Sequence, residues 1–172
     1  MAASVDPLVV GRVIGDVLDM FVPTATMSVY YGSKQVTNGC DIKPSINPPK
    51  VAIDGLPDQL YTLVMTDPDA PSPSEPSMRE WVHCRVHVEI SVLQPATALL
   101  RKELLAYMGP RPQVGIHRYI LVLFQQKGPL GAVQQLASRA NFSTRFFADH
   151  LNLGLPATVY FNAQKEPISR RR

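Results

Sequence analysis

The sequence predicts a mostly β fold, a packed sheet or sandwich of short strands with few helices. Sixteen prolines and ten glycines divide the 172 residues too often for long helices. From residue 27 onward, short apolar runs alternate with Pro, Gly, Asn and Asp, as strands joined by irregular loops require. Hydrophobic residues make up 45% of the chain and charged residues 18%, which is typical of a globular protein.

The first expected element is a helix near the N-terminus. Asp6 and Pro7 suit an N-cap and the first helical position. Apolar residues then recur at helical spacing as far as Phe21. The pattern predicts a helix of about four turns that ends before Pro23.

Six strands are predicted after this helix, each as an apolar run bounded by turn residues. Two runs, Leu63–Met65 and Ile120–Phe124, are apolar on both faces and are expected at the centre of the sheet. The composition of Ala98–Tyr107 and the potential cap at Ser143 predict two further short helices. The predicted strands are Met27–Tyr31, Val51–Ile53, Tyr61–Met65, Val82–Ile90, His117–Phe124 and Thr158–Phe161.

One domain over residues 1–172 is predicted, because no repeat or linker interrupts the pattern. The formal charge of +3 is concentrated in a basic tail at Arg170, Arg171 and Arg172, so the body is near neutral. We interpret the tail either as a solvated end or as a contact for an acidic partner, and not as a nucleic-acid-binding element.

The two cysteines indicate a reduced compartment. Cys40 and Cys84 lack the spacing of a metal site, so free thiols are expected. Charges interrupt the apolar N-terminal stretch, which excludes a signal-peptide pattern, and no apolar run is long enough for a membrane span. The expected location is the cytoplasm, with access to the nucleus.

Polar residues that could carry chemistry gather at the predicted ends of strands. Asp67 and Asp69 lie in a proline-rich loop after a central strand, whereas His83 and His117 lie at other strand ends. Imidazole and arginine groups donate to an anion, carboxylates can orient the imidazoles, and Gly109 permits close approach of backbone. The pattern favours an anion-binding site over a rigid turn with structural histidines.

Two other functions remain open at this point. One is a hydrolase that uses His83, His117 and Asp67 around a metal or a water molecule; the other is a protein-interaction scaffold with a vestigial pocket. The sequence lacks a His-Glu-x-x-His motif, a Gly-x-Ser-x-Gly motif and a phosphate-binding glycine loop. Binding is therefore favoured over catalysis, and no catalytic residue, metal or cofactor is predicted.

Several motifs give the chain a specific resemblance to the phosphatidylethanolamine-binding protein (PEBP) family. Its two signature regions are similar to Asp67–Pro71 with Arg79–His83, and to Gly115–Arg118. The resemblance to the plant class named MOTHER OF FT rests on the two ends of the chain and on Trp81. The further segments that resemble the family are Val5–Asp19, Asn141–Arg145, Leu153–Pro156 and Tyr160–Pro167.

The resemblance implies an antiparallel β-sandwich with a small pocket for phosphate or phospholipid head groups, without enzymatic activity. It also implies a cis peptide at Ala70–Pro71. Animal members have a tyrosine where this chain has Met78. Matched by motif, the pocket residues are Asp67, Asp69, Pro71, Trp81, His83, Gly109, Pro110, His117 and Tyr119.

Plant members of the family regulate flowering or seed germination through 14-3-3 proteins and bZIP transcription factors, so such partners are implied for a monomeric chain. The 14-3-3 partner is only weakly implied, because the matching positions hold Asp58 and Pro129, which are not basic. The stretch Cys84–Ala106 also departs from the family, since Arg85, His87 and Glu89 place polar groups on a face that the family buries.

Overall fold

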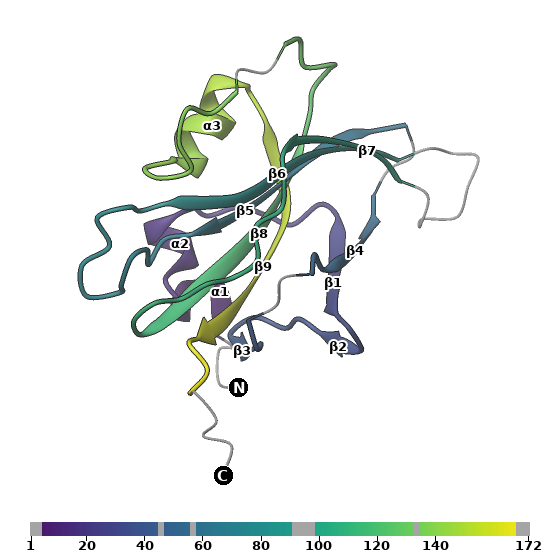
Figure 1. Cartoon of the computed structure of the whole chain (residues 1–172). Coiled ribbons are helices and arrows are strands. Elements are labelled where there is room, and N and C mark those ends of the chain that lie inside the picture. The colour runs from purple at the N-terminus through teal and green to yellow at the C-terminus, as the bar shows by residue number, and fades with distance from the viewer. Residues whose placement is uncertain (1–4, 45–46, 56–57, 91–98, 133–134, 168–172) are drawn as a thin grey trace.

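Two β-sheets pack face to face in the computed structural model of the chain, which describes residues 5–44, 47–55, 58–90, 99–132 and 135–167 (Figure 1). The smaller sheet has the strand order β2-β1-β4, and the larger sheet has the order β3-β9-β8-β5-β6-β7. All pairs are antiparallel except β3 with β9. The predicted mostly β sandwich is confirmed.

All six predicted strands are present. They correspond to β1 (Thr26–Tyr31), β4 (Lys50–Asp54), β5 (Leu60–Asp67), β6 (Trp81–Ile90), β8 (Ile116–Gln125) and β9 (Gly154–Gln164). Strands β5 and β8 lie at the centre of the large sheet, as their doubly apolar runs predict. The two-residue strands β2 (Lys34–Gln35) and β3 (Cys40–Asp41) carry no sequence pattern and were not predicted.

The predicted helix at Ala98–Tyr107 is wrong. Residues Leu99–Leu105 form strand β7 instead, which pairs antiparallel with β6 at the edge of the large sheet. Its leucines, lysine and glutamate favour a helix locally, but the open hydrogen-bonding edge of β6 overrides that preference.

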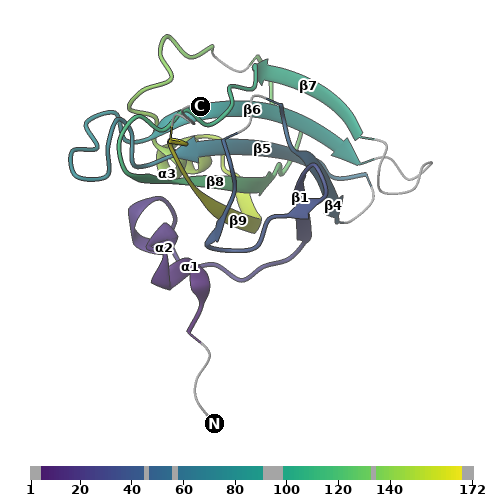
Figure 2. The same ribbon diagram turned by 60° about the horizontal axis from the view of Figure 1, so that its bottom comes forward.

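The single N-terminal helix of four turns is also wrong. Two separate turns, α1 (Pro7–Val10) and α2 (Val13–Asp16), occupy this segment (Figure 2). Arg12 and Gly15 have φ values of +57° and +114°, which an α-helix does not allow. The predicted cap is correct, because the Asp6 side chain accepts a hydrogen bond of 2.9 Å from the Leu8 N–H.

The central strands separate two apolar layers. Alternate residues such as Met65 and Leu121 pack towards β1, where Val29 is buried. Their neighbours Val64 and Ile120 pack on the other face of the sheet, with the N-terminal turns and α3 (Thr144–His150) (Figure 1). The period of two along each strand thus fills both layers, as a doubly buried strand requires.

Helix α3 begins where the sequence predicts. The Ser143 side chain accepts a hydrogen bond from the Phe146 N–H and caps the helix. This short peripheral helix is therefore confirmed. No helix within the described part of the chain is both long enough and apolar enough to cross a membrane.

The polar strand β6 meets α3 through a buried arginine. Arg85 pairs with Val64 of β5, its residue is 2% exposed, and its guanidinium carbon lies 5.5 Å from the centre of the Phe147 ring. Arg85 therefore lies on a covered face of the sheet, because helix α3 packs over it. The side chains of His87 and Glu89, and residues 91–98, lie outside the described part.

Both cysteines are free thiols, as predicted. Cys84 is buried between the sheets, whereas Cys40 in β3 is partly exposed. Burial raises the pKa of the Cys84 thiol to about 12, because a thiolate loses its hydration there.

Candidate functional site

The proline-rich loop that follows β5 is held by its own side chains. The Asp69 N–H donates a hydrogen bond of 2.7 Å to Asp67 Oδ1, and Ala70–Pro71 is a cis peptide, as expected. Gly115 approaches this loop with φ +79°, and a Cβ there would lie 2.9 Å from Cδ of Pro73. A glycine is therefore needed where the segment before β8 crosses the loop.

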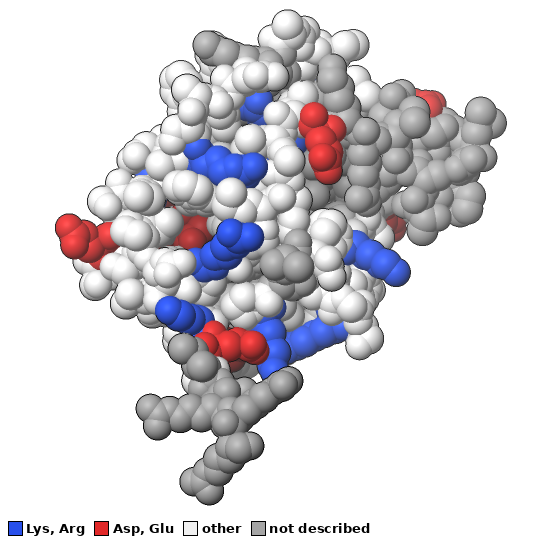
Figure 3. Space-filling model, viewed as in Figure 1, with Lys and Arg blue, Asp and Glu red and all other residues white. Residues whose placement is uncertain are grey.

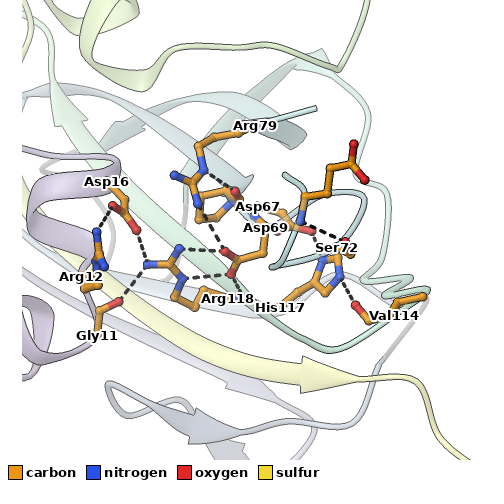
Figure 4. Close-up of polar contacts among 12 residues, drawn as sticks. Gly11, Arg12, Asp16, Asp67, Asp69, Ser72, Arg79, Val114, His117 and Arg118 are labelled. Atoms are coloured by element: carbon orange, nitrogen blue, oxygen red, sulfur yellow. Dashed lines mark hydrogen bonds and ion pairs between the residues drawn. The ribbon is translucent and has the colours of Figure 1, made fainter. Parts of the chain in front are cut away.

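His117 is fixed between two hydrogen-bond acceptors at the start of β8. Its Nδ1 donates to Asp67 Oδ2 at 2.8 Å, and its Nε2 donates to the Val114 carbonyl oxygen at 2.9 Å (Figure 4). A carbonyl only accepts, so both bonds form fully when the imidazole carries two protons. Burial alone lowers the pKa of His117, but the hydrogen bond and charge of Asp67 outweigh it and raise that pKa.

His83 has the opposite environment, although it lies in the same cluster. Its Nδ1 donates a hydrogen bond of 2.7 Å to the Met108 carbonyl oxygen, and the residue is 3% exposed. Burial lowers the pKa of His83, and the bond to Met108 offsets this only in part. Its buried Nε2 has no hydrogen-bond partner among the described residues.

Tyr119 joins the two histidines. Its ring centre lies 5.1 Å from that of His83, edge to face, and 6.3 Å from that of His117, in a stacked arrangement. Its other neighbour is Phe161, at 5.4 Å. Burial, with the nearby charge of Asp67, raises the pKa of the Tyr119 hydroxyl, which stays protonated.

Asp69 does not orient an imidazole, in contrast to the expectation for both carboxylates. It binds Arg118 through three hydrogen bonds, from the backbone N–H and from two guanidinium nitrogens, at 2.7–2.9 Å. Arg79 adds a longer contact of 3.7 Å to the same carboxylate. Burial alone raises the pKa of Asp69, but its bonds to Arg118 prevail and lower it.

Arg118 also connects the loop to the N-terminal segment. Its Nη1 lies 2.9 Å from the Asp16 carboxylate and donates to the Gly11 carbonyl oxygen at 2.9 Å (Figure 4). The role of this arginine was not predicted, although the residue belongs to a recognised motif.

The remaining predicted site residues frame this cluster. Trp81 pairs with Asp67 across β5 and β6 and is partly exposed. Gly109 and Pro110 are buried directly after Met108, whereas Pro71 is exposed in the loop. The structure thus brings Asp67, His83, His117 and Tyr119 together and commits Asp69 to an arginine.

Sequence reasoning missed two groups that hold His83 in place. One is the Met108 carbonyl oxygen, which leaves no trace in the residue type. The other is Arg139, which donates to the carbonyl oxygens of Val82, His83 and Ala106 at 2.8–3.1 Å. Within the described residues, no group of three or more His, Cys, Asp or Glu side chains is placed to hold a metal ion.

The chain is similar in sequence to known proteins over most of its length. The family model for phosphatidylethanolamine-binding protein matches residues 32–161. The Oryza sativa subsp. japonica protein MOTHER of FT and TFL1 homolog 2 is 54% identical, with 100% of both chains covered. FLOWERING LOCUS T of Arabidopsis thaliana is 47% identical, with 94% of this chain and 92% of that protein covered.

Solved structures show the same fold. A crystal structure of carboxypeptidase Y inhibitor complexed with its cognate proteinase matches with a TM-score of 0.81 and 25% identity, over 93% of this chain and 94% of that one. The phosphatidylethanolamine-binding protein from Plasmodium vivax matches in fold with a TM-score of 0.75. The predicted resemblance is confirmed, and the chain belongs to the phosphatidylethanolamine-binding protein family.

Proposed function

We propose that this chain is a non-enzymatic regulatory binding protein that holds a phosphate or phospholipid head group beside His83 and His117. The observation that carries the proposal is the Nε2 atom of His83, which is buried and has no hydrogen-bond partner among the described residues. A buried polar atom without a partner costs about 1–3 kcal/mol, which an arriving ligand atom can recover.

The two histidines supply different properties to an anion. The bond to Asp67 raises the pKa of His117 and so favours its protonated, positively charged form. His83 is neutral when free, since burial lowers its pKa, and it takes up a proton when an anion reaches Nε2. Four further residues near the two imidazoles would line the same pocket: Trp81, Gly109, Pro110 and Tyr119.

The regulatory role is supported by the relatives. Proteins named for flowering, such as FLOWERING LOCUS T and TERMINAL FLOWER 1, are 47% and 45% identical to this chain. We assign the chain to flowering or seed-germination signalling as a monomer, in the cytoplasm and nucleus, with a bZIP transcription factor as partner. A direct 14-3-3 contact has weaker support, because Asp58 and Pro129 offer no positive charge.

Calorimetry with inorganic phosphate and with phosphoethanolamine tests the pocket. The wild type is compared with His83→Gln, which keeps a polar side chain but removes the imidazole, and with His150→Gln as a matched control at an exposed position of α3. Binding that His83→Gln weakens and His150→Gln leaves unchanged supports the proposal. Equal binding by all three proteins removes His83 from the site.

The same samples test the hydrolase alternative. If the protein converts phosphoethanolamine or a phosphate monoester to inorganic phosphate, and His83→Gln stops the release, the site is catalytic and the non-enzymatic proposal fails. No release over the time of the binding experiment agrees with a binding role.

A further inference from the structure

A second, unpredicted site lies at the end of β9, outside the histidine cluster. A groove of about 1100 Å³ opens there between the turn that follows β1, the chain that leaves β3 and the C-terminal end of β9. Residues on its walls include Tyr31, Lys34, Lys43, Asn47, Gln164 and Lys165. Figure 3 shows basic side chains, with acidic ones between them, over this lower end of the molecule, where β2, β3 and the end of β9 lie in Figure 1.

Two of the three groove lysines have no carboxylate partner among the described residues. Lys34 donates its hydrogen bond to the backbone oxygen of Asp41, which is not a carboxylate. Lys34 and Lys165 take part in no ion pair within the part of the chain that is described. Two carboxylates, Asp41 and Glu166, also line the groove, so its three lysines leave one net positive charge for an acidic ligand.

The third groove lysine, Lys43, forms an ion pair with Glu166. Lys43 lies 3.4 Å from Glu166, and their side chains are 90% and 57% exposed. So exposed a pair is weak, because solvent screens it and both side chains lose rotamer freedom. A carboxylate or phosphate that enters the groove can displace Glu166 from Lys43.

The backbone beside the groove suits an extended chain. Strand β3 pairs with β9 only at Cys40 and Asp41, and the Ile42 N–H then donates to the Asn162 carbonyl oxygen. Strand β9 continues to Gln164, and the period of two places the backbone groups of Gln164 on the same edge as those of Asn162. An extended segment of a partner can therefore lie along this edge of β9, beyond the point where β3 ends.

We propose that this groove binds an extended acidic peptide segment of a partner protein. Acidic side chains on such a segment pair with Lys34, Lys43 and Lys165, and its backbone runs along the end of β9. The proposal does not depend on anion binding at His83.

Fluorescence anisotropy with a labelled peptide of alternating glutamate and serine residues tests the groove. Binding to the full chain is expected to weaken as NaCl is added, and to weaken roughly fivefold in Lys34→Glu and in Lys165→Glu, the upper range for one exposed charge pair. Lys127→Glu is the matched control, because this exposed lysine follows the far end of β8. It should bind as the wild type does.

Glu166→Gln separates the groove from a general effect of net charge. A general effect predicts the same gain in peptide affinity wherever a carboxylate is removed, whereas the groove predicts a larger gain at Glu166. Loss of the competing carboxylate should tighten peptide binding more than loss of a remote one in Asp149→Asn, on exposed α3. Thermal melting of each variant shows that it remains folded.

Three results would overturn the proposal. The first is equal weakening by Lys127→Glu and Lys34→Glu, which means attraction to net charge alone. The second is loss of peptide binding in His83→Gln, which places the peptide in the histidine pocket. The third is binding to phosphatidylserine vesicles, lost in Lys34→Glu, with no binding of the peptide, which makes the groove a lipid-surface site.

Discussion

At the scale of single residues, the two buried histidines show how local partners set opposite charges in one cluster. His117 faces a carboxylate and a carbonyl, so its protonated form is favoured. His83 faces one carbonyl and is otherwise enclosed, so its neutral form is favoured. Both are histidines near the start of a strand, and their contacts set the difference.

The first prediction concerns stability and His117. Its folded pKa is raised above the unfolded value of about 6.5, so its contribution is fully present below that pH and is lost as pH rises through the folded pKa. We expect His117→Asn to lower stability by about 1.5–3 kcal/mol in mildly acidic solution and by less at alkaline pH. Urea midpoints between pH 6 and 9 measure this; a constant difference between the two proteins would contradict it.

The second prediction concerns anion affinity and His83. In the free protein the pKa of His83 lies below its usual value, and a bound anion raises it. At a pH between the free and the bound pKa of His83, anion binding therefore takes up a proton. Phosphate affinity should therefore increase as pH falls from 8 towards 5, until the ligand or the carboxylates become protonated. Calorimetry in buffers of different ionisation enthalpy counts the protons. A His83→Gln protein with the same proton uptake would exclude this residue as the source.

At the scale of elements, β6 shows how a helix accommodates a polar strand. Arg85 would expose its charge if the large sheet ended in solvent, but α3 covers it and places Phe147 under the guanidinium. Long side chains of this kind bury their aliphatic stem as well as their charge. Removal of the charge and removal of the stem are therefore separate changes.

The third prediction separates the charge of Arg85 from its stem. Arg85→Met keeps much of the volume between β6 and α3 and removes a buried charge, so stability should change by less than about 1.5 kcal/mol. Arg85→Ala also leaves a cavity and should cost about 2–4 kcal/mol. Urea denaturation measures the stability of both variants. Equal losses of stability would show that polar contacts of the guanidinium contribute more than packing of the stem.

The elements also show which parts of the fold can be read from sequence. Strands β5 and β8 were predicted because apolar residues on both faces leave few alternatives. The N-terminal helix was predicted wrongly because Gly15 adopts a left-handed conformation that its spacing does not reveal. Strand β7 was missed because its residues favour a helix locally. Pairing with β6, which lies earlier in the chain, overrides that helical preference.

The same limit applies to the candidate site. Asp67, His83 and His117 were identified from residue type, position at strand ends and family motifs. The carbonyl oxygen of Met108 and the guanidinium of Arg139 were not, since their roles arise only when β6 and the following chain come together. The groove at the end of β9 escaped for the same reason, because its lysines are far apart in sequence. The single domain stays a prediction.

At the scale of the whole molecule, Arg118 connects the N-terminal segment to the loop that carries Asp67 and Asp69. Its guanidinium binds Asp69 on one side and Asp16 and Gly11 on the other. A separate contact, from Arg145 to Asp19, holds the same segment against α3 without touching the loop. Because Arg118 contacts both the segment and the loop, whereas Arg145 contacts only the segment, variants of the two arginines distinguish docking of the segment from ordering of the loop.

The fourth prediction uses this pair. Arg118→Lys loses the bidentate contact, so hydrogen exchange should speed up in residues 7–18 and in the loop, and phosphate affinity should fall by about 1 kcal/mol. Arg145→Lys should speed up exchange in residues 7–18 alone and leave affinity unchanged. Equal loss of affinity in both variants would mean that the N-terminal segment itself supports the pocket.

The unequal burial of the two cysteines makes the protein a natural candidate for site-selective labelling. Cys84 is enclosed between the sheets, and its thiol pKa of about 12 leaves almost no reactive thiolate at neutral pH. Cys40 is partly exposed in β3, next to Asp41, which lines the groove at the end of β9. A maleimide dye should therefore attach to Cys40 in the native chain, where its emission would report on whatever occupies that groove.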